Sequence, residues 1–292
     1  MNLFTSVEIG KMKSLLGYSD QLLLMGSCFV SEIGLRLQDA KFNCQVNPFG
    51  VLYNPMSIAT SLRMLLENSF PTRENFFSHE GLWHSYLFHG DFSAPTLESL
   101  QENIHRSLDA CHDVLKQISC LFITFGSAYV YELKETGQVV ANCHKLPEKQ
   151  FNRRRLSQQE IVHTYTDLLQ AIWQVNPACR VLFTVSPIRH IRDGLHANQL
   201  SKATLLLAID ELLKDRNPEC RIHYFPAYEI VLDELRDYRY FDEKMTHPTS
   251  VAVDVVWERF QHATMHPAVR QQAHYNMKQH KLEKHIPLHP SN

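Results

Sequence analysis

The chain has 292 residues, with 29 lysines and arginines against 31 aspartates and glutamates, and a formal net charge of −2. This near balance produces no field that would draw the protein to nucleic acid or to an acidic membrane. Hydrophobic residues make up 44% of the chain but never form a run of twenty, so the composition predicts a globular protein with a buried core and no membrane span.

The first residues contain no basic segment followed by an apolar one, so we expect no signal peptide. The seven cysteines are an odd number and include no C-x-x-C pair. Cysteines in this pattern are typical of reduced thiols that are buried as small hydrophobic side chains. These features together predict a cytoplasmic protein.

Five short apolar runs, with helical patterns between them, organise the chain. The runs are residues 21–26, 42–47, 120–126, 180–186 and 221–226. The third and fourth are almost continuously apolar, as strands covered on both faces are. The longer helical patterns are residues 56–68, 96–117, 157–175 and 200–214. Strands that alternate with helices predict a three-layer α/β/α sandwich around a mainly parallel five-stranded sheet.

Three segments do not fit this alternation. Residues 70–95 are aromatic and rich in turn residues, and we expect an insertion that forms one wall of a site. Residues 129–142 predict a β-hairpin with its turn at Thr136-Gly137. Residues 266–292 are polar and basic and predict either a surface helix or disorder. Because no linker or repeat is recognisable, we expect a single domain over residues 1–265 followed by this tail.

Several polar residues follow the predicted strands directly. The carboxyl ends of parallel strands lie along one edge of a sheet, where open α/β sheets bind their ligands. The residues expected at that edge are Gly26-Ser27, residues 47–50, Gly126-Ser127 and residues 186–190, with residues 142–145 returning on the hairpin and His247 arriving on the loop before the last long helix. Acyl transfer needs a hydroxyl nucleophile, a base for its proton and N–H donors for the oxyanion. The sequence therefore predicts a serine hydrolase or acyltransferase with Ser27 as nucleophile and His247 as base.

The same residues have other interpretations. Ser27 is a favoured residue for capping the helix that follows it. Cys28 is an alternative nucleophile, although we expect its side chain to face the core. Asn142 is equally typical of a hairpin end that bonds its own backbone. Trp83 and His84 belong either to the wall of a substrate pocket or to the packing of the insertion.

A group of basic and polar residues after the fourth run predicts either an anion site, for a phosphate or carboxylate of the substrate, or a solvated loop before a helix. The group consists of Arg189, His190, Arg192, Ser201 and Lys202. Neither His84 with His89 nor His190 with His196 has the spacing that places two imidazoles on one helical face, so we expect no metal site. The chain has no glycine-rich phosphate loop, and we expect no cofactor.

Seven short motifs resemble those of the GSCFA-domain family. They are residues 26–29 (Gly-Ser-Cys-Phe), 47–50 (Asn-Pro-Phe-Gly), 83–85, 140–145, 186–190, 198–202 and 224–229. The resemblance runs from about residue 20 to 262, and the fifth position of the signature is Val30 rather than alanine. The family is a bacterial branch similar to the SGNH (GDSL-like) hydrolases, which are esterases, lipases, deacetylases or acetyltransferases. The resemblance therefore implies a flavodoxin-like sheet and chemistry on an acyl or acetyl ester.

The resemblance also implies roles for single residues. Ser27 would be the nucleophile and His247 the general base. The backbone amides of Ser27 and Gly50, together with the side chain of Asn142, would form the oxyanion hole. The block around Gly126 lacks the asparagine usually found two positions on, and the hairpin would return the Asn142 amide to the same place.

The acid of the triad departs from the pattern of the SGNH enzymes. Those enzymes usually carry an aspartate three residues before the histidine, where this chain has Lys244. Asp242 and Glu243 are close in sequence and would replace it if the loop is shifted. Without an acid, a Ser-His dyad would work more slowly, and loss of activity is a further alternative.

We expect the substrate to be a small-molecule or carbohydrate ester, bound by Trp83, His84, Arg189 and His190. The alternative is a non-catalytic protein that holds a small ligand or carbohydrate in the same cleft, and Lys244 in the place of the acid favours it. An interaction protein that works through basic residues 270–285 is a third hypothesis, and a homo-oligomer is compatible with an exposed aromatic insertion.

Overall fold

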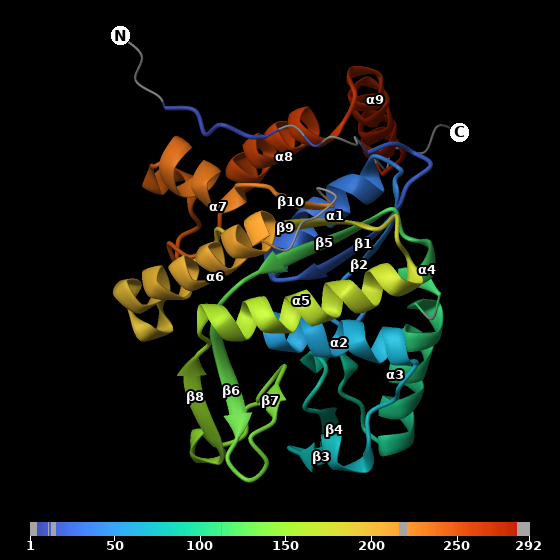
Figure 1. Cartoon of the computed structure of the whole chain (residues 1–292), viewed down its shortest axis with the longest axis vertical. Helices are drawn as coiled ribbons and strands as arrows, with labels where there is room; N and C mark the ends of the chain where they lie inside the picture. Colours follow the sequence, from blue (N-terminus) through green and yellow to red (C-terminus); the bar gives the residue numbers. More distant parts are fainter. Residues whose placement is uncertain (1–4, 11, 13–15, 112, 216–220, 285–292) are drawn as a thin grey trace, which may run out of the picture.

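The computed structural model describes residues 5–10, 12, 16–111, 113–215 and 221–284. Its centre is a five-stranded parallel sheet (Figure 1). The strands are β1 (Gln21–Gly26), β2 (Asn43–Val46), β5 (Cys120–Phe125), β9 (Arg180–Val185) and β10 (Ile222–Tyr224), in the spatial order β2-β1-β5-β9-β10. Each strand lies within one predicted run, so the predicted sheet is confirmed. The strand order is that of flavodoxin-like folds, in which the chain reverses direction across the sheet between β1 and β5.

Helices cover both faces of the sheet, because alternate residues of a buried strand point to opposite sides. Leu23 and Ile123 pack with α2 (Pro55–Glu67), α3 (Leu97–Cys111), α5 (Gln158–Val175) and α6 (Leu195–Asp215). Leu22 and Phe122 pack on the other side with α1 (Cys28–Asp39), α8 (Ser250–Thr264) and α9 (Pro267–Glu283). In Figure 1, α2 and α5 lie on one side of the sheet and α1 and α8 on the other. The predicted three-layer sandwich is confirmed.

The helix boundaries follow local signals in part. Ser157 and Glu160 form the predicted capping box at the start of α5. The pattern at 96–117 is divided into α3 and a short α4 (Val114–Gln117). Asp113, the residue directly before α4, has non-helical backbone angles. α6 begins at Leu195 rather than at 200, directly after Gly194, whose φ of 86° ends the preceding turn.

Two smaller sheets lie outside the central one. The predicted hairpin is present as β6 (Tyr129–Leu133) and β7 (Val139–Val140), and β8 (Phe151–Arg155) pairs with the other side of β6 to make three antiparallel strands. Residues 70–95 contain a second hairpin, β3 (Phe76–His79) with β4 (Leu82–Ser85). The remaining short helices are η1 (Arg73–Asn75), η2 (Gly90–Phe92), η3 (Glu148–Gln150), η4 (Ile191–Asp193), α7 (Ala227–Glu229), η5 (Ile230–Glu234) and η6 (Tyr238–Tyr240).

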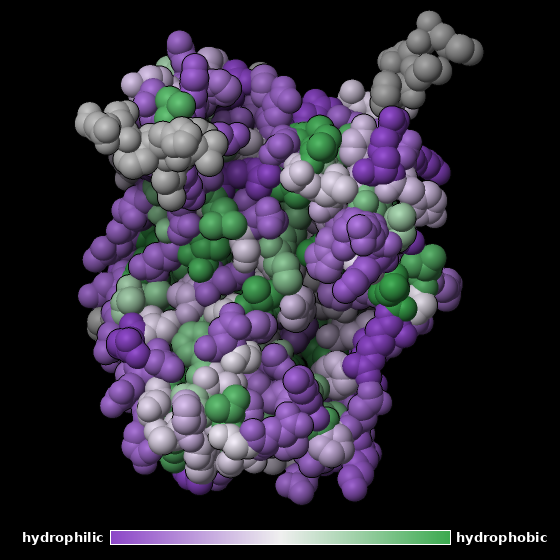
Figure 2. Space-filling view, turned by 180° about the vertical axis from the view of Figure 1, so that it is seen from behind, coloured by the Kyte–Doolittle hydropathy of each residue, from purple (hydrophilic) through white to green (hydrophobic). Residues whose placement is uncertain are grey.

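The tail forms the predicted helix over the residues of α9, while residues 285–292 lie outside the described residues. α9 packs on the end of α1: Ala273 is buried, and the Asn276 amide donates to the Ala40 carbonyl at 2.9 Å. Within the described residues, no helix is long and apolar enough to cross a membrane. The six described cysteines are unpaired, and Cys220 lies outside the described residues. On the face shown in Figure 2, hydrophobic residues occur in small groups separated by hydrophilic ones.

Candidate active site

Ser27 lies at a sharp turn between β1 and α1. Gly26 adopts a φ of 139°, and a Cβ atom there would lie 2.2 Å from the Thr124 carbonyl oxygen, so only glycine fits. Gly126, directly after β5, also comes close to the serine, because a Cβ atom there would lie 3.2 Å from that of Ser27. The serine is therefore placed between the ends of β1 and β5, where the order of the sheet reverses.

The hydroxyl of Ser27 has no hydrogen-bond partner among the described residues. Ser27 occupies the N-cap position of α1, but its Oγ accepts no N–H from the helix. The side chain is only 1% exposed, and Oγ is shielded from solvent. An unpaired buried hydroxyl costs about 1–3 kcal/mol, so such a group in a native structure calls for an explanation other than stability.

The loop between η6 and α8 brings an acid to His247. Asp242 accepts the backbone N–H groups of Thr246 at 2.9 Å and His247 at 3.1 Å through Oδ1. Its Oδ2 lies 3.5 Å from His247 Nδ1, and the Thr246 hydroxyl lies 3.0 Å from the same nitrogen. The N–H of Thr246, together with His247, lowers the pKa of Asp242. Asp242 therefore contacts the imidazole, whereas Glu243 and Lys244 are exposed and have no described contact with it.

The three predicted oxyanion donors differ in what they already bind. The Ser27 N–H donates to the Thr124 carbonyl at 3.1 Å, and the Gly50 N–H donates to the Asn47 carbonyl at 2.9 Å. Asn142 accepts the N–H of His144 through Oδ1 at 2.8 Å, as a hairpin-end asparagine does. Its Nδ2 has no acceptor among the described contacts, so Asn142 has a donor still available.

One cavity of about 900 Å³ contains Ser27, Asn142 and His247 in its lining. Its remaining walls come mainly from the loops after β5 and β9 and from the three-stranded sheet with the connection between β7 and β8, and Tyr53 and Asn54, directly before α2, add to them. Cys28 packs against the core on the α1 side, as expected, but it also lines this cavity, with its Sγ 3.5 Å from the Tyr53 hydroxyl.

Residues 70–95 do not form the expected wall, since none of them lines this cavity. His84 is 8% exposed, and both ring nitrogens are used inside the insertion, Nδ1 with the Ser93 hydroxyl at 2.7 Å and Nε2 with the His79 carbonyl at 3.1 Å. Trp83 packs under the guanidinium of Arg73, 5.2 Å from the ring centre. These contacts are those of the packing alternative, and neither residue lies at the cavity that holds Ser27.

Arg189 and His190, the two other predicted substrate-binding residues, do line the cavity. The His190 backbone N–H donates to Asn198 Oδ1 at 2.9 Å, and the ring lies edge-on to Tyr53 with centres 5.9 Å apart. Its Nε2 is shielded from solvent and has no partner among the described residues. Burial, with smaller contributions from Lys202 and His247, lowers the pKa of His190 to about 4, so this imidazole is neutral at physiological pH.

Ser201 and Lys202 belong neither to an anion site nor to a solvated loop. Lys202 is 1% exposed, and its Nζ donates to the carbonyls of Gly126 and Ser186, both at 2.6 Å. Burial lowers the pKa of Lys202 to about 7. The Ser201 hydroxyl accepts the N–H of Ala128 at 2.8 Å. The first turns of α6 thus hold the ends of β5 and β9 beside Ser27.

Sequence reasoning missed this role of Lys202, although a signal was present. Lys202 stands three residues before Leu205 and seven before Ile209, on the buried side of α6. A lysine at an apolar position of a helix indicates a buried charge that needs oxygen partners. Among the described residues, no group of three or more His, Cys, Asp or Glu side chains gathers as metal ligands do.

Comparison with known proteins identifies a family. No curated protein sequence matches this chain. Among solved structures, the chain is similar to an acetyl xylan esterase (Est2A) from the rumen bacterium Butyrivibrio proteoclasticus, with 9% identity, a TM-score of 0.44, and coverage of 84% of this chain and 63% of that one. It is also similar to a Clostridium thermocellum family 3 carbohydrate esterase, with 13% identity, a TM-score of 0.37, and coverage of 87% and 98%. Residues 21–260 match the GSCFA family, and the chain therefore belongs to that family.

Proposed function

We propose that this protein is a serine hydrolase or acyltransferase that acts on an ester through an acyl-serine intermediate. The observation that carries the proposal is that one cavity is lined both by an unpartnered serine hydroxyl and by an imidazole whose Nδ1 lies 3.5 Å from the Asp242 carboxylate. Ser27 is the nucleophile, His247 the general base and Asp242 the residue that orients it. Lys244, which favoured a non-catalytic protein, is exposed, and the Asp242 carboxylate, 3.5 Å from His247 Nδ1, supports Asp242 as the acid.

The steps follow from these positions. His247 Nε2 takes the proton of the Ser27 hydroxyl as Oγ attacks the ester carbonyl. Asp242, which faces Nδ1, stabilises the imidazolium that forms. Asn142 Nδ2 donates to the oxyanion, supported by the positive end of the α1 dipole. The leaving alcohol takes the proton back from His247 and leaves the acyl group on Oγ. Water or a second alcohol then attacks the acyl-serine by the same route in reverse.

The size of the cavity favours a small substrate. A volume of about 900 Å³ is in the range of small-molecule sites. Tyr53, Tyr129, Tyr131 and Phe151 contribute aromatic side chains to its lining. A small-molecule or carbohydrate ester fits such walls, because aromatic faces pack against the apolar faces of sugars and acyl chains.

Labelling with a fluorophosphonate probe tests the proposal. We expect wild type to be labelled and Ser27→Ala and His247→Ala to lose labelling, because the probe reacts with a hydroxyl that a base has activated. Ser78→Ala, an exposed serine on β3, is the matched control and keeps the label. Folded wild type that stays unlabelled would contradict the proposal and favour a ligand-binding protein.

A further inference from the structure

The cavity around Ser27 is locally cationic in a chain of net charge −2. Its charged lining consists of Lys145, Arg153, Arg189 and Arg192 against Glu148 and Asp193. Positive side chains thus exceed negative ones by two, before either histidine is considered. Such a lining attracts anions into a cleft whose protein walls screen the charges poorly.

Two of the four cations are neutralised by ion pairs. Arg153 donates to both carboxylate oxygens of Asp193. Arg192 pairs with Glu148 and also donates to the Tyr131 hydroxyl at 2.7 Å. These contacts join η4 to the three-stranded sheet, so both arginines serve to hold the wall together.

Arg189 is fixed in place without a carboxylate partner among the described residues. Its backbone N–H donates to the Thr246 carbonyl at 3.0 Å, and its Nη1 donates to the Met245 carbonyl at 3.1 Å. The guanidinium lies over Phe241, 5.5 Å from the ring centre. One of its five N–H groups is used in this way, which leaves an oriented cation with open donors against the loop of His247.

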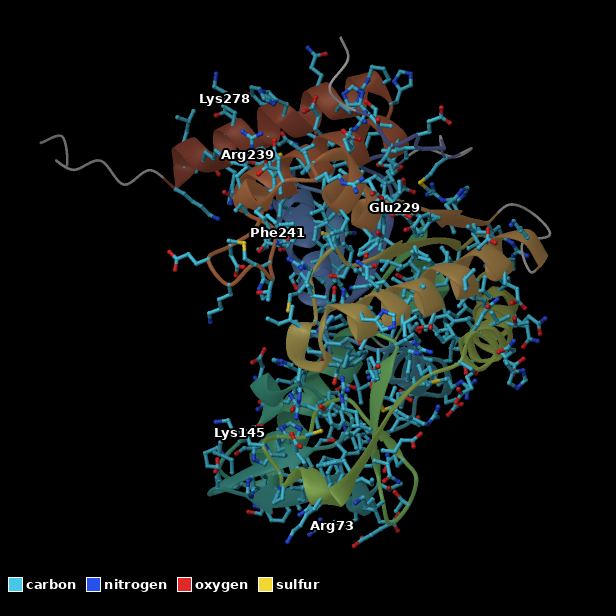
Figure 3. The ribbon with its side chains drawn as sticks, turned by 90° about the vertical axis from the view of Figure 1, so that its left-hand side faces the viewer. Arg73, Lys145, Glu229, Arg239, Phe241 and Lys278 are labelled. Carbon is cyan, nitrogen blue, oxygen red and sulfur yellow. The ribbon has the colours of Figure 1, made fainter. Side chains whose placement is uncertain are left out.

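Arg189 also lines a second cavity of about 380 Å³. The carboxylate of that cavity, Asp237, is already paired with Arg239 at 3.2 Å. Arg189 therefore stands where the two cavities adjoin. Lys145, the other cation without a described partner, lies on the same side of the molecule as Phe241 in Figure 3, towards the bottom of the view.

We propose that the substrate ester carries a second, anionic group, a carboxylate or a phosphate, and that Arg189 binds this group while the ester carbonyl lies at Ser27. A guanidinium presents parallel N–H groups that match the oxygens of either anion, and the contact is charge-assisted. Lys145 adds attraction without a fixed contact. The position of the ester rests on the proposed function, whereas the anion site itself does not depend on catalysis.

Two pairs of matched esters test the inference. Monomethyl and dimethyl succinate differ by one carboxylate, and 2-acetoxyethyl phosphate and 2-methoxyethyl acetate differ by the phosphate. Calorimetric titration of Ser27→Ala measures their binding without turnover. We expect the anionic member of at least one pair to bind about tenfold or more tightly than its neutral partner. The pair with the larger ratio identifies the anion.

Arg189→Gln, made in the Ser27→Ala protein, should bring this ratio close to one. Arg63→Gln, which alters an exposed arginine on α2 outside the cavity, is the matched control and should keep the ratio. Raising the salt concentration should lower the ratio in Ser27→Ala itself, which tests the inference even where Arg189→Gln does not fold. Equal binding within both pairs, or no binding of any of the four esters, would overturn it.

The two proposals fail in different ways. If wild type is not labelled by the fluorophosphonate but Ser27→Ala prefers the anionic esters, the anion site is supported and the hydrolase proposal is rejected. If wild type is labelled but Ser27→Ala shows no such preference, the hydrolase proposal is supported and the anion site is rejected.

Discussion

The loop that carries His247 turns back on Asp242, so that an acid five positions away in the sequence lies beside the imidazole. Two backbone N–H groups of the loop bond one carboxylate oxygen, which leaves the other near Nδ1. Lys244 occupies the usual position of the acid in sequence and points into solvent. At the scale of single residues, the geometry of the loop therefore decides which carboxylate lies beside the imidazole, and the spacing of the sequence motif does not.

Asp242→Asn is expected to lower kcat by about a hundredfold or more, because the orienting acid of a serine triad stabilises the imidazolium. KM should change little, since Asp242 contacts no substrate in the proposed mechanism. Steady-state kinetics on the ester identified by screening provides the measurement. Glu243→Gln is the matched comparison and should lower kcat far less. An equal loss of kcat in the two variants would argue against Asp242 as the acid.

At the scale of elements, α6 connects strands that are distant in sequence. Asn198, Ser201 and Lys202, along its first turns, bond the backbone after β9 and β5. A neutral lysine amine has two N–H groups, which match the two carbonyls that Lys202 bonds. The position of Ser27 against Gly126 thus depends on a helix that does not itself line the cavity at Lys202.

Lys202→Met should lower the free energy of unfolding by about 2 kcal/mol or more at pH 9, because it leaves two buried carbonyls unpaired. The loss should be smaller at pH 6.5. Burial lowers the pKa of Lys202 to about 7, so between that pH and about 10 the unfolded chain binds a proton that the folded protein lacks, and the contribution of Lys202 rises with pH.

Urea unfolding at the two pH values measures both effects. Lys214→Met, which alters an exposed lysine near the end of the same helix, is the control and should show neither the loss nor its dependence on pH. A Lys202→Met protein as stable as wild type at pH 9 would show that the two hydrogen bonds contribute nothing to stability.

At the scale of the whole molecule, buried neutral histidines limit stability in acid. Burial lowers the pKa of His144 and of His190 to about 4. The neighbours of His144 include His84, whose ring centre is 4.6 Å away, and its Nε2 lies 2.8 Å from the Ser85 carbonyl. Since the ordinary pKa of histidine is about 6.5, the unfolded chain binds more protons than the folded one between pH 6.5 and 4.

The free energy of unfolding should therefore fall as the pH is lowered from 6.5 to 4, by up to about 3 kcal/mol for each of these histidines. His144→Gln, which keeps a donor for the Ser85 carbonyl, should flatten this dependence in urea unfolding measured across the range. His163→Gln is the control, because that histidine is exposed on α5. An unchanged slope in His144→Gln would show that its titration does not contribute.

The central fold could be predicted because its signals are local. Strands buried on both faces, such as residues 120–125, are apolar throughout, and Ser157 with Glu160 marks a helix start in four residues. The site was harder to predict, because its decisive contacts join residues that are far apart in the sequence. The bond from Lys202 to Gly126 spans 76 positions, and the apolar neighbours of Lys202 on α6 indicate a buried charge but not which carbonyls it bonds. For the same reason, the aromatic hairpin at 70–95 resembled a pocket wall, although its polar atoms bond one another.

The chain leaves the core for the three-stranded sheet and returns to the core at two residues that lie side by side. The segment that forms the sheet begins after β5 and ends before α5, and the Leu156 N–H closes the base by donating to the Ala128 carbonyl at 2.8 Å. This one segment contributes Asn142, Lys145 and Arg153 to the cavity, while Ser27 and His247 stay on the core. The walls of the cavity are thus divided between the core, which carries Ser27 and His247, and one continuous segment, residues 129–155, which Arg153 ties to Asp193 and His144 ties to the Ser85 carbonyl.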